Sequence, residues 1–326
     1  MSDVTIVGAG VVGLWAARAL LARGIRPQIL DTNGSPGPHA CSWWAGGMLA
    51  PYCEGAVAEP IIVKHGALAA ANWSEITEVH HNGTLVLALD RDRSELEYFA
   101  RRTTNHRTLD ANDIAMLEPQ LAGQHRRGLF FENEAHLVPR HALANLTSAL
   151  ESDGVIIQPV AAIPCDLPGT VIDCRGFAAR DDLPGLRGVR GEMLLLHSDE
   201  IQLNRPIRLL HARHPLYIVP RGNGYFMLGA TQIESAAKGP VTARSALELL
   251  SAAYALDPRF GEAKIIELGA DLRPAFHDNI PRIMQHNHVL HLNGMYRHGY
   301  LMAPALARQA ALFIEHSIKG DLFHVH

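Results

Sequence analysis

The sequence lacks any run of about 20 uninterrupted apolar residues, the length that a helix needs to span a bilayer. Its most apolar early stretch, residues 14–22, is short and contains Arg18. It also lacks room for a secretory signal peptide, because a strand-like segment already begins at Val4. These absences predict a protein that is neither inserted in a membrane nor exported.

Cysteine is scarce, and none of the 4 cysteines shows the C-x-x-C spacing of metal or redox motifs. The 19 histidines are numerous but scattered. A metal site requires three or four converging ligands, so we predict no metal. Free thiols are typical of a reducing compartment, and we expect the protein in the cytoplasm.

Blocks of basic residues are also missing, and 29 basic against 33 acidic side chains give a net charge of −4. This balance argues against nucleic acid as a partner. Apolar residues, in contrast, make up 48% of the 326 residues. A chain of this length and composition can bury the cores of two domains.

Glycine is concentrated near the start of the chain, between two strand-like segments. Residues 4–7 are apolar and β-branched, residues 11–23 have helical spacing, and residues 28–30 again resemble a strand. The glycines at positions 8, 10 and 13 form G-x-G-x-x-G between the first strand and the helix. This order of strand, turn, helix and strand indicates a dinucleotide-binding β-α-β unit.

Each glycine of the motif has a physical reason. Gly8 permits the tight turn, Gly10 lets a pyrophosphate approach the backbone, and Gly13 lets the helix pack on the strand. The unpaired amides at the helix N-terminus then attract phosphate. Asp31 ends the second strand at about the interval, roughly 20 residues, at which an acid accepts from ribose hydroxyls.

Beyond this unit the chain alternates between two kinds of region. We expect a helix over residues 61–78, a strand-rich block over 190–232, and a helix from about 304 to 318. A helix over 242–256 is expected to bury one side, formed by Leu247, Leu250, Ala253 and Tyr254. The pattern predicts an α/β Rossmann-like nucleotide domain of residues 1–78, 135–188 and 266–326, and an α+β substrate domain of residues 79–134 and 189–265 with a mainly antiparallel sheet.

Five separated stretches carry a family resemblance. Besides residues 8–31, these are SWWAGGMLAPY (42–52), LYIVPRGNGYFMLGAT (216–231), GADLRPAFHDNIPRI (269–283) and HLNGMYRHGYLMAPALA (291–307). In this order the sequence resembles the D-amino acid oxidase family of flavoproteins. It is most similar to the glycine oxidases associated with thiamine biosynthesis.

The resemblance implies non-covalent FAD, because no Cys or His lies in a recognisable attachment motif. It implies that the cofactor is held by five parts of the chain. These are the pyrophosphate turn, the ribose position, the loop beside the flavin, an adenine contact and the loop of the C-terminal motif. These residues are Gly8, Gly10, Val11, Val12, Gly13, Asp31, Thr32, Ser42, Gly46, Gly47, Met48, Val160, Met295, Tyr296, Arg297, His298, Gly299, Tyr300 and Leu301. Family members often have Asn where this chain has His298, which leaves the hydrogen bonding of that loop open.

The resemblance also implies a substrate site. Arg273, in G-x-D-L-R-P, is at the position that binds the substrate carboxylate, and a guanidinium can do so with two parallel hydrogen bonds. The alternative is an ion pair of Arg273 with Asp271 or Asp278. Tyr217 matches a pocket tyrosine, and Arg297 is either a second substrate-side charge or an anchor of the flavin loop. Gln232 follows G-A-T and would make the pocket more polar.

The implied reaction is oxidative deamination of glycine, or of another small amine or D-amino acid, by hydride transfer to flavin N5. The products would be an imine, then glyoxylate or a 2-oxo acid, with ammonia and hydrogen peroxide from O2. In relatives the imine supplies the thiazole of thiamine, and relatives suggest a homo-oligomer.

Three alternatives stay open from the sequence. They are a sarcosine or D-amino acid oxidase or dehydrogenase of the same superfamily, a non-catalytic flavin-binding partner protein, and an NAD-dependent dehydrogenase. The absence of a second G-x-G-x-x-G argues against a monooxygenase reduced by NAD(P)H.

Overall fold

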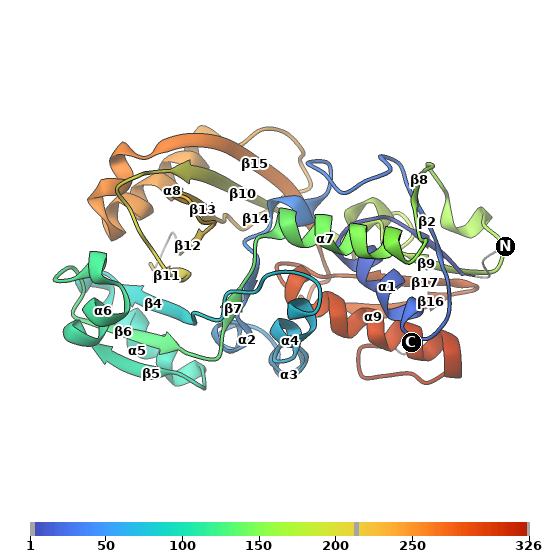
Figure 1. Cartoon of the computed structure of the whole chain (residues 1–326), viewed down its shortest axis with the longest axis horizontal. Coiled ribbons are helices and arrows are strands. Elements are labelled where there is room, and N and C mark those ends of the chain that lie inside the picture. The colour runs from blue at the N-terminus through green and yellow to red at the C-terminus, as the bar shows by residue number, and fades with distance from the viewer. Residues whose placement is uncertain (1–3, 212–214, 325–326) are drawn as a thin grey trace.

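Two β-sheets organise the chain, and they lie in the two lobes that Figure 1 shows side by side. This computed structural model describes residues 4–211 and 215–324. The outermost ends of the predicted nucleotide domain, residues 1–3 and 325–326, lie outside the described residues. No helix in the two described ranges is long and apolar enough to cross a membrane.

The first sheet has six strands, of which all but β16 run parallel. In order across the sheet they are β16 (Arg282–His286), β17 (Val289–Asn293), β9 (Thr170–Asp173), β1 (Val4–Val7), β2 (Gln28–Asp31) and β8 (Ile157–Pro159). All of β1 is buried, as expected of a central strand in a covered parallel sheet. The predicted β-α-β unit is therefore present, with β1 beside β2.

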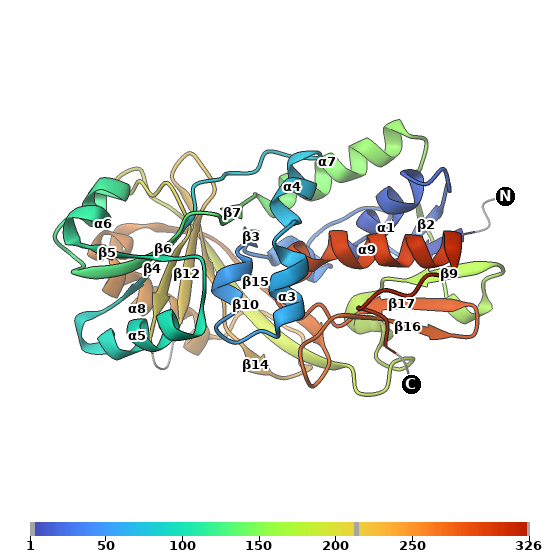
Figure 2. The same ribbon diagram turned by 90° about the horizontal axis from the view of Figure 1, so that it is seen from below.

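Three helices gather on one side of this sheet (Figure 2): α1 (Val11–Leu21), α7 (Pro139–Ser152) and α9 (Gly299–His316). α1 packs against both α7 and α9. Small residues line the contact of α1 with α9, where Ala16, Ala17, Ala303 and Ala307 are almost completely buried. Side chains this small let the two helices approach closely.

The second sheet has nine strands and fills the other lobe. Its main path is β14 (Ile233–Glu234), β10 (Arg187–His197), β13 (Tyr225–Gly229), β12 (Leu216–Pro220), β11 (Ile207–Leu210), β4 (Thr84–Ala88), β6 (Arg127–Phe131) and β5 (Arg107–Asp110), while β15 (Lys264–Ala275) pairs with β10. Most of its pairs are antiparallel, and β11 with β4 is parallel. Three helices accompany it: α5 (Arg93–Arg102), α6 (Ala111–Leu117) and α8 (Ala243–Leu256).

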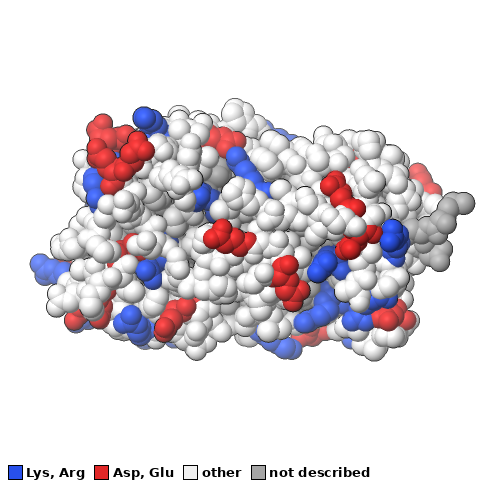
Figure 3. Space-filling model, viewed as in Figure 1, with Lys and Arg blue, Asp and Glu red and all other residues white. Residues whose placement is uncertain are grey.

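Short elements connect the two lobes. They are β3 (Met48–Leu49), which pairs with β7 (Ala135–His136), and the helices α2 (Pro51–Glu54), α3 (Pro60–Gly66) and α4 (Ala69–Ser74). The helix expected over residues 61–78 is thus divided into α3 and α4. On the face shown in Figure 3, acidic and basic side chains are interspersed, without a broad area of one sign.

The C-terminal helix begins earlier than expected, at Gly299 rather than near Pro304. Proline is disfavoured inside a helix because it has no N–H to donate to the carbonyl four residues before it. Here that carbonyl belongs to Tyr300, and the indole Nε1 of Trp73 donates to it at 2.8 Å. A side chain from α4 therefore replaces the missing backbone donor, and the helix continues through Pro304.

The buried side of α8 is different from the predicted one. Leu247 and Tyr254 are 68% and 56% exposed, whereas Leu249, Ala252 and Leu256 are buried. The prediction is right for Ala253, which is buried, and for Leu250, which packs partly against the core, and it is wrong for Leu247 and Tyr254. A helix with this many apolar residues has two overlapping apolar stripes, which periodicity alone does not separate.

One predicted domain boundary also falls in the wrong place. β15 pairs with β10 from Lys264 to Ala275, so residues 266–275 belong to the second sheet and not to the nucleotide-binding sheet. The end of β15 lies in the stretch GADLRPAFHDNIPRI (269–283), and the composition of this stretch did not indicate a strand of this length. The rest of the domain division stays a prediction.

Candidate active site

A cavity of about 790 Å³ lies where the two lobes meet. The ends of β1, β17 and α1 line it from the first lobe, and β10, β12 and β15 line it from the second. Most of the predicted site residues lie here: Gly8, Gly10, Val11, Val12, Asp31, Ser42, Gly46, Gly47, Met48, Tyr217, Arg273, Met295, Tyr296, Arg297, His298, Gly299, Tyr300 and Leu301. Gly13, Thr32 and Val160 are not among the lining residues.

The glycine-rich turn has the geometry that a pyrophosphate requires. Gly8 has a φ of +105°, a value that other residues rarely adopt. A Cβ on Gly13 would lie 1.8 Å from the carbonyl oxygen of Gly8, so only glycine lets α1 pack this closely on the turn. A Cβ on Gly10, in contrast, would meet only the Ser42 Oγ at 3.6 Å, which leaves this side open to a ligand.

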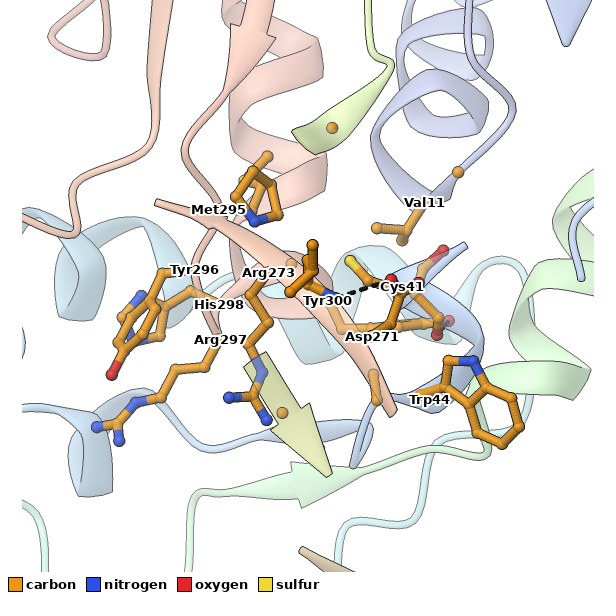
Figure 4. A pocket seen from close by; sticks show the side chains of 18 of the residues that line it. Val11, Cys41, Trp44, Asp271, Arg273, Met295, Tyr296, Arg297, His298 and Tyr300 are labelled. Atoms are coloured by element: carbon orange, nitrogen blue, oxygen red, sulfur yellow. Dashed lines mark hydrogen bonds between the residues drawn. The ribbon is translucent and has the colours of Figure 1, made fainter. Parts of the chain in front are cut away.

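The start of α1 offers unpaired donors to the cavity. No side chain caps this helix, and Val11 and Val12 in its first turn line the cavity. The Ser42 Oγ is buried beside them, and within residues 4–211 and 215–324 it has no hydrogen-bond partner. Together these groups would suit an anion at the end of the cavity where Val11 lies, on the right in Figure 4.

Asp31 lies at the end of β2 and lines the same cavity. Its carboxylate accepts from the amides of Ala9 and Asn33, both at 2.9 Å. These bonds fix the side chain and leave further lone pairs for hydroxyl donors. The Val160 amide donates to the Asp31 carbonyl at 3.1 Å, so Val160 lies beside the ribose position although it does not line the cavity.

Arg273 reaches the cavity from β15. Its Nη1 donates to the Thr231 carbonyl at 3.0 Å. Gly191 on β10, two residues after the register partner of Arg273, makes room for it, because a Cβ there would lie 2.2 Å from Nη2 of Arg273. In the described part of the chain neither suspected acid pairs with it, since Asp278 accepts from Arg282 at 2.6 Å and Asp271 accepts from the Leu272 amide at 2.7 Å.

Tyr217 lines the cavity from β12 and is accommodated by two glycines. A Cβ on Gly46 would lie 2.9 Å from the tyrosine ring, and a Cβ on Gly229 would lie 3.0 Å from its ring and hydroxyl. The glycines of the 42–52 and 216–231 motifs thus make space for one aromatic side chain.

Arg297 is held by Glu54, a residue that the sequence reasoning did not select. The Arg297 Nε donates to Glu54 Oε2 at 2.7 Å, and the His298 Nε2 lies 2.9 Å from the same oxygen. Arg208 on β11 donates to Oε1 at 3.4 Å. Burial alone would raise the pKa of Glu54, but these three cationic or hydrogen-bonding neighbours hold it well below its usual range.

This cluster defines the hydrogen bonding of the loop, which the sequence left open. The His298 ring bonds Glu54 at the position where family members often have Asn. The cluster also anchors Arg297, which still lines the cavity and extends beside Arg273 (Figure 4). Two signals could have revealed the cluster: Glu54 lies two residues after the 42–52 motif, and Arg208 interrupts an apolar strand.

Two polar contacts complete the lining. The Tyr296 hydroxyl donates to Gln232 Oε1 at 2.7 Å and connects the loop before α9 to the loop after β13. Cys41 lies near Asp271 and Arg273, and burial, with a smaller effect of Asp271, raises its thiol pKa to about 12. Cys41 is therefore an uncharged thiol at neutral pH. Among the described residues no group of His, Cys, Asp or Glu could hold a metal ion.

These features fit FAD. The glycine turn, the free amides of α1, the unpartnered Ser42 hydroxyl and Asp31 would hold its pyrophosphate and ribose. The cavity continues from this end to Arg273 and Tyr217, which leaves room for a flavin ring and a small substrate.

Comparison with known proteins agrees. The "Putative thiamine biosynthesis oxidoreductase ThiO" of Rhizobium etli is 50% identical over 311 residues, which cover 94% of this chain and 95% of that protein. The glycine oxidase of Pseudomonas aeruginosa is 25% identical, covering 94% of this chain and 93% of its own. The crystal structure of glycine oxidase from Geobacillus kaustophilus has the same fold, with a TM-score of 0.82, 21% identity, and coverage of 99% and 96%.

A family model described as FAD dependent oxidoreductase (DAO) matches residues 3–312. The match spans both sheets and every part of the cavity lining described above. The chain therefore belongs to the FAD-dependent oxidoreductase family, and it is an enzyme that uses FAD.

Proposed function

We propose that this enzyme oxidatively deaminates glycine, and that the resulting imine supplies the thiazole of thiamine. The observation that carries the proposal is Arg273, a guanidinium without an acidic partner in the described part of the cavity, for which Gly191 makes room. The names of the two sequence relatives support the substrate and the pathway.

Arg273 would bind the substrate carboxylate with two parallel charged hydrogen bonds, and the Tyr217 hydroxyl would add a third. This arrangement would fix the substrate with its Cα–H directed at the cofactor. When bound, FAD would accept the hydride from Cα and pass the two electrons on to O2, which gives hydrogen peroxide.

Among the cavity residues that the structure describes, none is an obvious general base for this reaction. Glu54 is engaged by Arg208, Arg297 and His298, and its lowered pKa makes it a weak base. Cys41 holds its proton. We infer that the amine binds in its neutral form, so that loss of a hydride from Cα yields the iminium ion. This ion releases a proton to water to give the imine, which water then hydrolyses to glyoxylate and ammonia where it is not passed on.

The test is peroxide release by the purified yellow protein in air, with glycine, sarcosine, D-alanine and D-proline. Preference for glycine supports the proposal. Bleaching of the flavin without oxygen, but no peroxide in air, would indicate a dehydrogenase with another acceptor. Preference for sarcosine or a D-amino acid would assign one of the alternative oxidases, and no reaction with any small amine would favour a flavin-binding partner protein.

Two further properties belong to this proposal. We expect acid denaturation to release the flavin into solution, whereas a yellow precipitate would show a covalent bond. We also expect the enzyme to work in the cytoplasm as a homo-oligomer, which light scattering of the purified protein would test.

A further inference from the structure

Arg221 follows β12 and bonds a cavity loop from behind. Its Nη2 donates to the carbonyls of Ala45 at 3.1 Å and Gly46 at 2.9 Å, and its Nη1 donates to the Leu137 carbonyl at 2.9 Å. Ala45 and Gly46 line the cavity, whereas Arg221 does not. One guanidinium of the second lobe thus holds the loop that the first lobe contributes to the site.

The charge of Arg221 is not balanced by an acid. Within residues 4–211 and 215–324, the hydrogen bonds of its guanidinium go to peptide carbonyls, and no Asp or Glu forms an ion pair with it. Burial lowers the pKa of Arg221 to about 10, so that it is still a cation at neutral pH. A desolvated cation without a counter-charge is costly to maintain, and it favours a negative charge nearby.

The peptide groups of this loop lie between Arg221 and the cavity, and their orientation is set by Arg221. The carbonyls of Ala45 and Gly46 point to Arg221, and the carbonyl of Gly47 accepts from the Leu137 amide at 2.9 Å. In a trans peptide the N–H points opposite to the carbonyl. The amides of Gly46 and Gly47 therefore face away from Arg221, toward the cavity that both residues line.

These two amides are available to a ligand. In the described part of the chain neither donates a hydrogen bond to another residue. The φ of +71° at Gly47 gives the loop its sharp bend, which a side chain would resist. A pair of free amides, with a buried cation behind their peptide groups, is an environment that stabilises negative charge.

We propose that Arg221 is a positioning residue that makes this loop stabilise the anionic reduced form of the bound FAD. It acts through the peptide groups of Ala45, Gly46 and Gly47 and does not touch the cofactor. The inference rests on the placement of FAD in the cavity that is part of the proposed function.

The experiment compares three purified FAD-loaded variants with the wild type. Arg221→Met removes the charge, and Arg221→Lys keeps the charge on a side chain that cannot form the same fork. Arg140→Met is the matched control, because Arg140 lies 4.6 Å above the neighbouring Trp43 ring but is neutralised by Glu267 at 2.7 Å. The measurements are the two-electron reduction potential of the flavin, the Kd of sulfite, which adds to oxidised flavin as an anion, and the Kd of FAD.

We expect Arg221→Met to raise the sulfite Kd at least tenfold and to make the reduction potential more negative. Arg140→Met should change the sulfite Kd less than twofold. In Arg221→Lys, burial should bring the lysine pKa into the accessible range. As the pH rises and the ammonium loses its proton, the sulfite Kd should rise more steeply than in the wild type, a pH profile that a merely structural role would not produce.

An unchanged potential and sulfite Kd in Arg221→Met would overturn the inference, and so would equal shifts in Arg140→Met. If Arg221→Met does not fold, the pH profile of Arg221→Lys decides: a wild-type profile overturns the inference. None of these measurements uses glycine. Failure of the inference with intact glycine oxidation is thus distinguishable from failure of the proposed function, in which glycine would not be oxidised whatever the flavin potential.

Discussion

The Nε of Arg297 donates to Oε2 of Glu54 at 2.7 Å, between residues that are 243 positions apart in the sequence. The bond fixes α2 to the loop that precedes α9. Because Arg208 of the second sheet also donates to Glu54, a single carboxylate joins both lobes at the wall of the cavity. The stability of the site depends on this one charge.

We expect Glu54→Gln to destabilise the protein by about 3 kcal/mol, because it leaves the charges of Arg208 and Arg297 without compensation. Urea unfolding of the cofactor-free protein measures this loss. Glu59→Gln is the control, since Glu59 also lines the cavity but is exposed. Its effect should remain within about 0.5 kcal/mol, and equal effects of the two substitutions would contradict the role of Glu54.

We expect Arg273→Met to lower kcat/KM for glycine, mainly through a higher KM, because the carboxylate of the substrate loses its charged partner. The loss corresponds to about 2–5 kcal/mol of transition-state stabilisation. FAD should remain bound, as its absorbance spectrum would show. Tyr217→Phe removes a single hydroxyl and should cost only about 1 kcal/mol. Wild-type kinetics in Arg273→Met would remove this residue from the substrate site.

Gly191→Ala provides a second, independent test of Arg273. The new methyl would lie 2.2 Å from the Arg273 Nη2, so the flexible end of the arginine must move. We expect a higher KM for glycine, with little change in the unfolding free energy, since the backbone of Gly191 is ordinary strand. A KM equal to that of the wild type would show that Arg273 need not occupy its observed position.

The pH dependence of stability should reveal His136. Burial, together with the nearby His80 and Arg221, lowers the pKa of His136 from 6.5 to about 3. Between these values the unfolded chain binds a proton that the folded protein does not, so this group destabilises the fold as the pH falls below 6.5. From pH 7.5 to pH 5 the effect amounts to about 2 kcal/mol. His136→Gln should therefore gain about this much relative to the wild type over that range.

Glu134→Gln is the matched comparison, because its stability relative to the wild type should change with pH in the direction opposite to that of His136→Gln. Burial raises the pKa of Glu134 from 4.5 to about 7, so the folded protein binds a proton that the unfolded chain does not, and stability falls as the pH rises through this range. The free energy of unfolding of Glu134→Gln, relative to that of the wild type, should therefore decrease as the pH falls from 7.5 to 5. Parallel pH profiles for both variants, from urea unfolding, would contradict these assignments.

The β-α-β unit was predictable because its chemistry is local. Gly8, Gly10 and Gly13 are a few residues apart, and backbone geometry requires glycine at Gly8, through its φ of +105°, and at Gly13, through its contact with Gly8. The predicted β-α-β unit is confirmed by the structure, and FAD as the cofactor is confirmed by the family match. The individual roles of the other cavity residues stay predictions.

Glu54 and Arg208 could not be found in the same way, because the partners of a buried charge come from distant segments. Glu54 is paired across 154 residues with Arg208 and across 243 with Arg297. Likewise, Pro304 reads as a helix start in the sequence, and only the indole of Trp73 explains why the helix continues through it. Local patterns contain no information about which distant group satisfies a polar atom.

The contact between α1 and α9 has a consequence for how the protein is made. β1 and α1 precede the other elements of the described fold in the chain, whereas α9, which packs on α1, follows them. The apolar surface of α1 that α9 covers therefore has no partner from α9 until that helix has been synthesised. The contact between α1 and α9 can consequently form only late in synthesis or after it, so this part of the cofactor-binding lobe is completed by an element distant in the sequence.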